Sequence, residues 1–304
     1  MARRRRTSKR RRGGDSSHVL VVLFIGLLAT GLWWINQQRQ HPLTPTAHLQ
    51  SDGQPIRIAT WNLRKFSERA RPDLLAIAEL IKANQFDLIA IQEVQQQGQA
   101  VQNLRQQLGD PWCATISDPA GNGERFAFLY RGDRIEPTAE PRLLPSDTGP
   151  TLARTPYLGG FRAGQFGFLL LTVHLWYGDA GLNERRRQEV LSLAQTARTL
   201  LASSAEKDLI VLGDFNEFRR GGNLHYWQDL GWKQLILEPT NLSSTEIYDN
   251  LLIDPRPTRE FAGTTGVIRF DEIRYQNNDK TASDDVSDHR PAYADFATDL
   301  PDDD

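Results

Sequence analysis

Hydrophobic and polar positions alternate along the chain from Ile56 onward in two different rhythms. Short apolar or period-two segments predict strands, whereas apolar residues three and four positions apart predict amphipathic helices. The predicted strands are 56–61, 87–91, 125–130, 166–173, 208–212, 247–253 and 292–296. The predicted helices are 74–82, 99–108 and 183–201. This alternation, without an internal repeat or linker, indicates one α/β domain built as a layered sandwich of sheets and helices.

An uncharged apolar segment, 19–35, precedes this domain. Its length is at the short end of what crosses a bilayer, and Trp33 and Trp34 at one end suit the headgroup zone. The first twelve residues hold eight basic side chains. This pattern predicts a transmembrane signal anchor at 19–35, a basic cytoplasmic arm at 1–18 and an extracytoplasmic domain. A cleaved signal peptide and a buried core helix are the alternatives, but the bulky residues after Ile35 form no small-residue cleavage site.

Composition and charge refine this organisation. With 24% charged and 39% hydrophobic residues the chain suits a folded protein. We predict a proline-containing linker at 36–55, a catalytic domain at 56–298 and an acidic tail at 299–304. Removing the eight basic side chains of the arm from 36, against 38 acidic ones, leaves about −10 on the remainder. That charge argues against binding a polyanion by charge alone, although a bound divalent cation changes the local field. The single cysteine, Cys113, excludes an intrachain disulfide.

Carboxylate, amide and histidine side chains recur at the ends of the predicted strands. They are Asn62, Glu93, His174, Asp214, Asn216, Asp249, Asp288 and His289. Polar groups at strand ends can converge on one rim of a sandwich. Oxygen donors with few histidines favour Mg²⁺, with Mn²⁺ or Ca²⁺ as alternatives, over zinc. Such a cation neutralises phosphate oxygens, and a histidine held by a carboxylate orients or deprotonates an attacking water.

Each of these residues taken singly has an ordinary structural explanation. An Asp-x-Asn sequence after a strand is more often a turn or a helix cap than a site. A histidine at a strand end is more often a hydrogen-bonded structural group, and Glu93 alone would be a surface charge. The functional interpretation therefore depends on the whole set and its order.

In that order, the residues resemble the motifs of the endonuclease/exonuclease/phosphatase family. The resemblance covers about residues 56–297 and rests on Trp61-Asn62, Gln92-Glu93, His174-Leu175, Gly213-Asp-Phe-Asn216, Asp249 and Ser287-Asp-His289. It implies a four-layer DNase I-like α/β sandwich, with two packed β-sheets flanked by helices. It also implies metal-dependent hydrolysis of phosphate esters.

The resemblance further implies a metal site and a base. Glu93 and Asp288 would be the Mg²⁺ ligands, with Asn62 close to the metal. His289, paired with Asp249, would act as the base or as the electrostatic partner of the water.

The remaining roles follow from the same resemblance. Asp214 and Asn216 would orient the nucleophile and stabilise the phosphate in flight. The segment 122–130 is similar to one in DNase I-like nucleases that couples a glutamate with the first histidine, here Glu124 with His174. The segment Arg154-Thr-Pro-Tyr157 is similar to one whose arginine contacts a phosphate, a role that suits a guanidinium fork.

Two positions depart from the DNase I-like pattern. Asn122 stands where those nucleases place a tyrosine that enters the minor groove, and Gln95 stands where they place an arginine. Both changes remove minor-groove contacts while leaving the phosphate chemistry intact. They put efficient cutting of double-stranded DNA in doubt.

Three functions are therefore compatible with the sequence. The first is an endonuclease-type phosphodiesterase acting on DNA or RNA. The second, an alternative to the first, is a membrane-associated phosphatase or phospholipase acting on a lipid head group or small phosphoester. The third is a binding module on an inactive fold, which the retained site residues disfavour. The predicted partners are the phosphodiester substrate and, through 19–35, a membrane; no protein partner is inferred.

Overall fold

The computed structural model describes residues 53–145, 152–178, 183–218 and 222–302. The predicted arm, the anchor and most of the linker lie outside these ranges, so they stay predictions. Within the described ranges, no helix is long and apolar enough to cross a membrane. Residues 49–304 form a compact unit of their own.

The first β-sheet has the strand order β11-β12-β1-β2-β4-β3. Its strands are β1 (Ile56–Phe66), β2 (Leu88–Val94), β3 (Trp112–Ile116), β4 (Arg125–Arg131), β11 (Phe261–Val267) and β12 (Ala292–Phe296). The neighbours β1 and β2 run parallel, and the other pairs are antiparallel. The central position of β1 and β2 places the carboxyl ends of two buried strands side by side.

The second β-sheet repeats this arrangement with the order β5-β6-β7-β8-β10-β9. Its strands are β5 (Glu136–Leu143), β6 (Tyr157–Ala163), β7 (Phe166–His174), β8 (Leu209–Asp214), β9 (Lys233–Gln234) and β10 (Asp249–Ile253). Here β7 and β8 are the parallel neighbours. Each sheet therefore has one central parallel pair whose strand ends carry polar residues.

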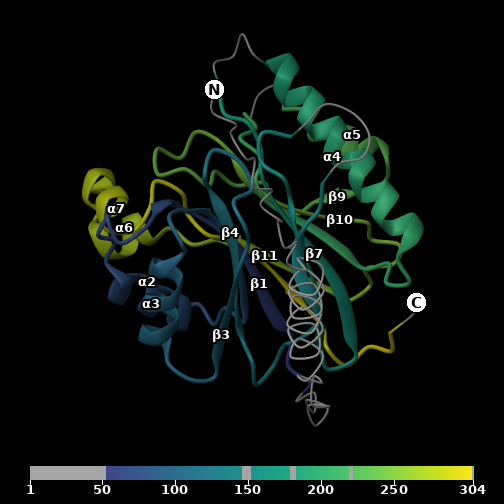
Figure 1. Cartoon of the computed structure of the whole chain (residues 1–304), viewed down its shortest axis with the longest axis horizontal. Helices are drawn as coiled ribbons and strands as arrows, with labels where there is room; N and C mark the ends of the chain where they lie inside the picture. The colour runs from purple at the N-terminus through teal and green to yellow at the C-terminus, as the bar shows by residue number, and fades with distance from the viewer. Residues whose placement is uncertain (1–52, 146–151, 179–182, 219–221, 303–304) are drawn as a thin grey trace, which may run out of the picture. The chain divides into compact units, whose positions relative to one another are not determined.

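Helices cover the outer faces of both sheets (Figure 1). The helices α2 (Leu74–Ala83), α3 (Gln99–Leu108), α6 (Phe270–Tyr275) and α7 (Asp279–Asp285) pack on the first sheet, and α4 (Asn183–Ser203) and α5 (His225–Asp229) pack on the second. Between the sheets, the Phe128 ring stacks on Tyr157 at 4.8 Å and meets Phe161 edge-on at 5.4 Å. The four-layer α/β sandwich predicted from the resemblance is confirmed.

Sequence periodicity located most of the buried strands and missed the edge strands of both sheets. The predicted helix 99–108 coincides with α3, and all predicted strands are present within a few residues of their expected ends. The edge strands β3, β5, β9 and β11, the interior strand β6, and the short helices α5 to α7 were not predicted. The strand β5 is mostly exposed and contains two prolines, and β11 carries Gly and Thr at exposed positions. Neither segment has the apolar alternation by which a half-buried strand is recognised.

Gly213 allows the two central strands of the second sheet to approach closely at their carboxyl ends. Its φ is +143°, and a Cβ atom at this position would lie 2.1 Å from the carbonyl oxygen of Val173. Val173 is its partner across the β7–β8 ladder. Any other residue would therefore force the strands apart directly before Asp214.

We expect Gly213→Ala to destabilise the fold by more than about 2 kcal/mol, because backbone strain and a backbone clash add. Urea unfolding measures the loss. The matched control is Gly109→Ala, where φ is also positive (+78°) but no atom lies within 4 Å of the added Cβ. That control should lose about 1 kcal/mol. Equal losses in the two variants would contradict the clash.

Candidate active site

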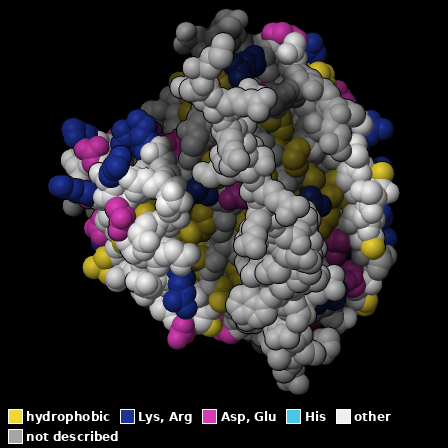
Figure 2. All heavy atoms as spheres, in the orientation of Figure 1, with side chains coloured by type: hydrophobic (Ala, Val, Ile, Leu, Met, Phe, Trp, Pro, Cys, Tyr) yellow, Lys and Arg dark blue, Asp and Glu magenta, His cyan; other side chains and the backbone are white. Residues whose placement is uncertain are grey.

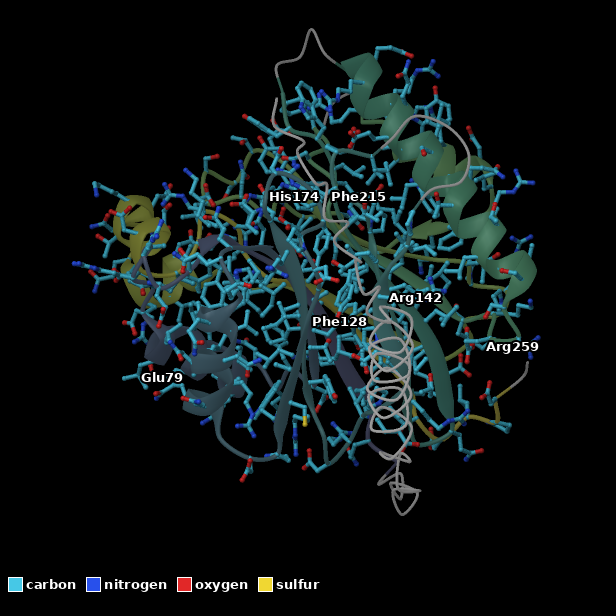
Figure 3. All side chains as sticks on the ribbon, in the orientation of Figure 1. Glu79, Phe128, Arg142, His174, Phe215 and Arg259 are labelled. Atoms are coloured by element: carbon cyan, nitrogen blue, oxygen red, sulfur yellow. The ribbon has the colours of Figure 1, made fainter. Side chains whose placement is uncertain are left out.

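The polar residues that follow the two central strand pairs meet at one rim of the sandwich. Asn62 lies in β1 opposite Gln92, and His174 pairs with Asp214 at the ends of β7 and β8. Figure 3 shows His174 and Phe215 at one end of the sandwich, away from Phe128 in the middle. Because both parallel pairs end at this rim, side chains from both sheets converge there.

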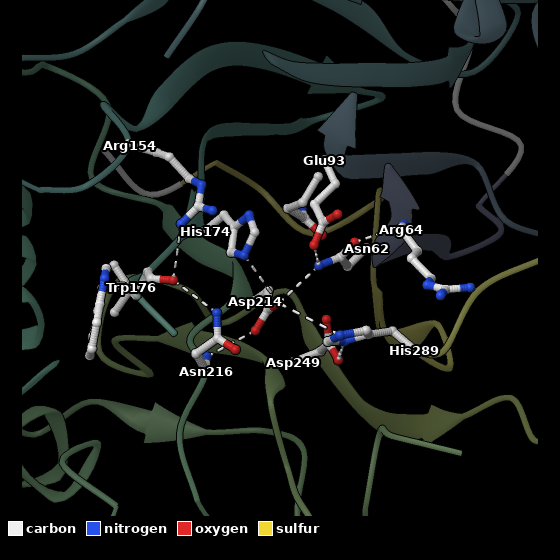
Figure 4. A network of polar contacts seen from close by, with 12 residues as sticks. Asn62, Arg64, Glu93, Arg154, His174, Trp176, Asp214, Asn216, Asp249 and His289 are labelled. Atoms are coloured by element: carbon white, nitrogen blue, oxygen red, sulfur yellow. Dashed lines mark hydrogen bonds and ion pairs between the residues drawn. The ribbon is translucent and has the colours of Figure 1, made fainter. Parts of the chain in front are cut away.

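Asp214 is the centre of this group (Figure 4). Its side chain is 1% exposed. Its Oδ2 accepts a hydrogen bond from Asn62 Nδ2 at 2.9 Å and lies 3.6 Å from His174 Nε2 and 3.8 Å from His289 Nε2. Its Oδ1 accepts from the backbone N–H of Asn216 at 2.9 Å. Two imidazoles thus approach one buried carboxylate from different elements.

Asn62 links the two sheets at the rim. Its Nδ2 also donates to Glu93 Oε1 at 3.1 Å, and its Oδ1 accepts from the backbone N–H of Arg64 at 2.9 Å. The backbone contact fixes which end of the amide faces the carboxylates. Asn62 therefore faces Glu93 and Asp214 with its NH₂ group.

The backbone around Glu93 is held in a bulge between β1 and β2. Glu93, Arg64 and Lys65 all have positive φ (58°, 41° and 52°), and the ladder register shifts here. The N–H of Lys65 donates to Glu93 Oε2 at 2.8 Å. Such strained conformations persist only where the surrounding structure stabilises them, and they cluster at functional sites. Here they direct the Glu93 side chain toward the rim.

His289 is held by Asp249 on one side of Asp214. Asp249 is fully buried in β10, and its Oδ2 lies 2.8 Å from His289 Nδ1. Burial lowers the pKa of His289, but the nearby charges of Asp249 and Asp214 outweigh it and raise that pKa to about 10. This raised pKa favours the imidazolium form of His289, whose N–H can donate to a phosphate oxygen.

His174 is held by Glu124 on the other side of Asp214. His174 Nδ1 lies 3.1 Å from Glu124 Oε2, and Arg154 donates to both oxygens of Glu124, with Nη2 at 2.9 Å from Oε1. Arg154 Nη1 points toward the carbonyl of Leu175 at 3.5 Å. The guanidinium predicted to contact phosphate is thus already engaged in orienting Glu124.

The ionisation of Glu124 should make acid stability depend on this cluster. Burial alone would raise its pKa, but hydrogen bonds from His174 and Arg154 lower it from 4.5 to about 2. A depressed pKa stabilises the fold above pH 4.5, and the contribution is lost as pH falls toward 2. We expect Glu124→Gln to show a smaller decline in melting temperature than the parent between pH 4.5 and 2. Parallel declines would contradict this assignment.

The structure offers donor atoms for a divalent cation. Among the described residues, atoms of Asp214, Asp249 and His289 lie within 4.8 Å of one another. Asp249 Oδ1 is buried and has no hydrogen-bond partner in the described part of the chain. Asp288 is half exposed, with Oδ2 3.6 Å from Arg64 Nε. Carboxylate donors with an unsatisfied buried oxygen suit a hard cation, although the assignment of Glu93 and Asp288 as its ligands stays a prediction.

Several buried polar residues that support the rim were not predicted as site residues. Ser287 Oγ donates to the carbonyl of Asn62 at 2.6 Å and accepts from the N–H of His289 at 3.0 Å. Trp61 Nε1 donates to the carbonyl of His289 at 2.9 Å. Gln92 Nε2 donates to Thr172 Oγ1 at 2.9 Å, from one sheet to the other. Trp61, Gln92 and Ser287 each stand directly beside a predicted site residue in the motifs of the resemblance, and that position was the available signal for these contacts.

The sandwich and its rim of carboxylates and carboxylate-held histidines define a hydrolase of phosphoester bonds. A family model described as Endonuclease/Exonuclease/phosphatase family matches residues 59–289. The chain belongs to this family, whose enzymes are metal-dependent phosphoester hydrolases. A search among curated proteins gave no match.

Solved structures share the fold at low sequence identity. An endonuclease/exonuclease/phosphatase family protein from Bacteroides thetaiotaomicron is 16% identical with a TM-score of 0.58, over 83% of this chain and 98% of that chain. The human Nocturnin catalytic domain with bound sulfate is 19% identical with a TM-score of 0.56, over 80% and 94%. A mannosyl-6-phosphatase from B. thetaiotaomicron is 16% identical with a TM-score of 0.56, over 79% and 98%.

Proposed function

We propose that this chain is a Mg²⁺-dependent phosphodiesterase of the endonuclease type that cleaves DNA or RNA. The observation that carries the proposal is the placement of two histidine–carboxylate pairs around Asp214. In a phosphodiester displacement the attacking and leaving oxygens lie on opposite sides of phosphorus. Two imidazoles at 3.6 and 3.8 Å from one carboxylate suit a reaction that needs groups on both sides.

The chain's own residues divide the work. Asp214 orients the attacking water and accepts its hydrogen bond, while the charged N–H of His289 binds a non-bridging phosphate oxygen. His174, fixed by Glu124, serves the opposite side, and Asn216 is held for substrate contact by its own backbone and side-chain bonds. A divalent cation, held by Glu93 and Asp288, would supply neutralisation of the phosphate charge when bound.

Basic residues next to the rim favour a polyanionic substrate. Arg64 and Lys65 are exposed near the end of β1, and Arg69 and Arg71 are exposed in the segment that follows it. Figure 2 shows Lys and Arg side chains at the side of the unit where α6 and α7 lie, with Asp and Glu side chains among them. Exposed cations beside a site suit the phosphates on either side of a scissile bond, which fix register without reading sequence.

A phosphatase acting on a small phosphoester is the second candidate. It is favoured by the net negative charge of the chain outside its basic arm. It is also favoured by Asn122 and Gln95, which replace the tyrosine and arginine that make minor-groove contacts in DNase I-like nucleases. The structurally similar mannosyl-6-phosphatase carries such an activity on a related fold. The membrane tether predicted at 19–35 adds a lipid head group to this class of substrates.

The test is a substrate panel on the purified full chain with Mg²⁺, Mn²⁺, Ca²⁺ or EDTA. Plasmid DNA, single-stranded DNA and RNA are compared with sugar phosphates and phospholipids. Cleavage of any nucleic acid in Mg²⁺ and its loss in EDTA are expected. Phosphate or head-group release with intact nucleic acids would overturn the nuclease proposal in favour of the second candidate.

A further inference from the structure

A row of aromatic rings leads from His289 to solvent. The Tyr248 ring lies 5.7 Å from the His289 imidazole. Phe218 meets Tyr248 at 6.1 Å and Tyr177 meets it at 6.3 Å, both edge-on. We call Tyr177, Phe218 and Tyr248 the aromatic row. Its outer member, Tyr177, is 60% exposed, so much of one large ring is available to a ligand beside the site.

The catalytic strand ends themselves place these rings. Tyr177 follows His174 in the segment after β7, Phe218 follows Asn216 after β8, and Tyr248 directly precedes Asp249 in β10. Three different elements therefore bring one ring each to the His289 side of the rim. A phosphate bound at the rim has the aromatic row within reach of the group attached to it.

A buried arginine fixes two of the segments that carry the row. Arg186 of α4 is fully buried, and its guanidinium lies 4.4 Å from the Phe218 ring centre. Its Nη1 donates to the carbonyl of Gly178 at 3.1 Å, next to Tyr177. The backbone N–H of Trp176 also donates to Glu189 of α4 at 2.8 Å. The row is thus held in place before a ligand arrives, which limits the entropy lost on binding.

We propose that the aromatic row is a stacking subsite for one unpaired nucleobase next to the scissile phosphate. Exposed rings beside a phosphate site bind bases by their faces, and every base offers such a face. A base inside a duplex is already stacked on its neighbours, so only an unpaired base can reach Tyr177. The enzyme therefore acts on single strands or frayed ends in preference to duplex. This inference rests on the proposed nuclease function.

Binding tests the subsite without turnover. In full-length protein carrying Asp214→Asn, with Mg²⁺, calorimetry compares adenosine 5′-phosphate with ribose 5-phosphate, which differ in the base. We expect the nucleotide to bind about tenfold more tightly. Adding Tyr177→Ala should bring the ratio near one, whereas Tyr177→Phe should preserve it. Ile273→Ala, an exposed apolar residue of α6, is the control. Equal affinities, or a ratio that Tyr177→Ala leaves unchanged, would overturn the subsite.

Cleavage separates this inference from the nuclease proposal. The parent enzyme should cut a single-stranded oligonucleotide faster than its duplex. Tyr177→Ala should lower kcat/KM on the single strand about tenfold and leave an abasic strand little affected. If single strand and duplex are cut at equal rates and Tyr177→Ala does not change those rates, the subsite is refuted and the nuclease proposal stands. Absence of all cleavage with the binding ratio intact refutes the nuclease and keeps a subsite for a planar group on another phosphoester.

Discussion

Replacement of Asp214 by Asn is expected to lower kcat/KM for phosphoester hydrolysis by about 10³-fold or more, while the protein remains folded. The carboxylate is buried between His174 and His289, with Oδ2 at 3.6 Å from one imidazole nitrogen and 3.8 Å from the other. The amide keeps an acceptor for the N–H of Asn216 but removes the negative charge. Losses of this size are typical when a positioned acid–base group or its electrostatic partner is removed.

The matched comparison is Asp229→Asn, the same chemical change at an exposed position of α5. That variant should retain parental kcat/KM, and circular dichroism and melting temperature report whether each variant is folded. His289→Ala should reproduce the loss caused by Asp214→Asn. If a folded Asp214→Asn or His289→Ala variant turned over substrate at the parental rate, the site assignment would be wrong.

The chain order of residues predicted the members of the candidate site but not their contacts. Asp214, His174 and His289 were predicted because each lies at or next to an end of a predicted strand, and Asp249 because it lies within one; strands are set by local periodicity. The contact between His289 and Asp249 spans 40 positions and depends on which strands are neighbours. Periodicity says nothing about that order, so the family resemblance had to supply it.

Arg154 and Asn62 show a second limit. A guanidinium can bind phosphate or carboxylate equally well by its geometry, and the structure turns Arg154 toward Glu124. The amide of Asn62 has an oxygen and an NH₂ group of similar shape, and the backbone N–H of Arg64 donates a hydrogen bond to the oxygen. In both cases the partner is decided by which groups the fold brings near the side chain, and side-chain type does not encode that.

Arg290→Ala is expected to cost about 3–5 kcal/mol of unfolding free energy. Arg290 follows His289 directly and is 1% exposed. Its guanidinium forms an ion pair with Asp271 of α6, with Nε at 2.7 Å from Oδ1. Its Nη1 donates to Ser244 Oγ at 2.8 Å. Removing the arginine would leave the carboxylate of Asp271 buried without its counter-charge. Urea unfolding gives the loss, and Arg269→Ala, whose ion pairs are partly exposed, should change stability by less than about 1 kcal/mol.

A double variant distinguishes the value of this ion pair from the penalty of breaking it. Replacing Arg290 by Met and Asp271 by Leu removes both charges while keeping side-chain volume, so stability should recover most of what Arg290→Ala loses. Activity should not recover in parallel if Arg290 also sets the position of His289. The carbonyl of His289 accepts a hydrogen bond from Trp61 Nε1, and the backbone N–H of Arg290 donates to the carbonyl of Thr240. Full stability with lowered kcat and unchanged KM would identify Arg290 as a positioning residue. A double variant as unstable as Arg290→Ala would mean that its loss comes from packing and not from an unpaired charge.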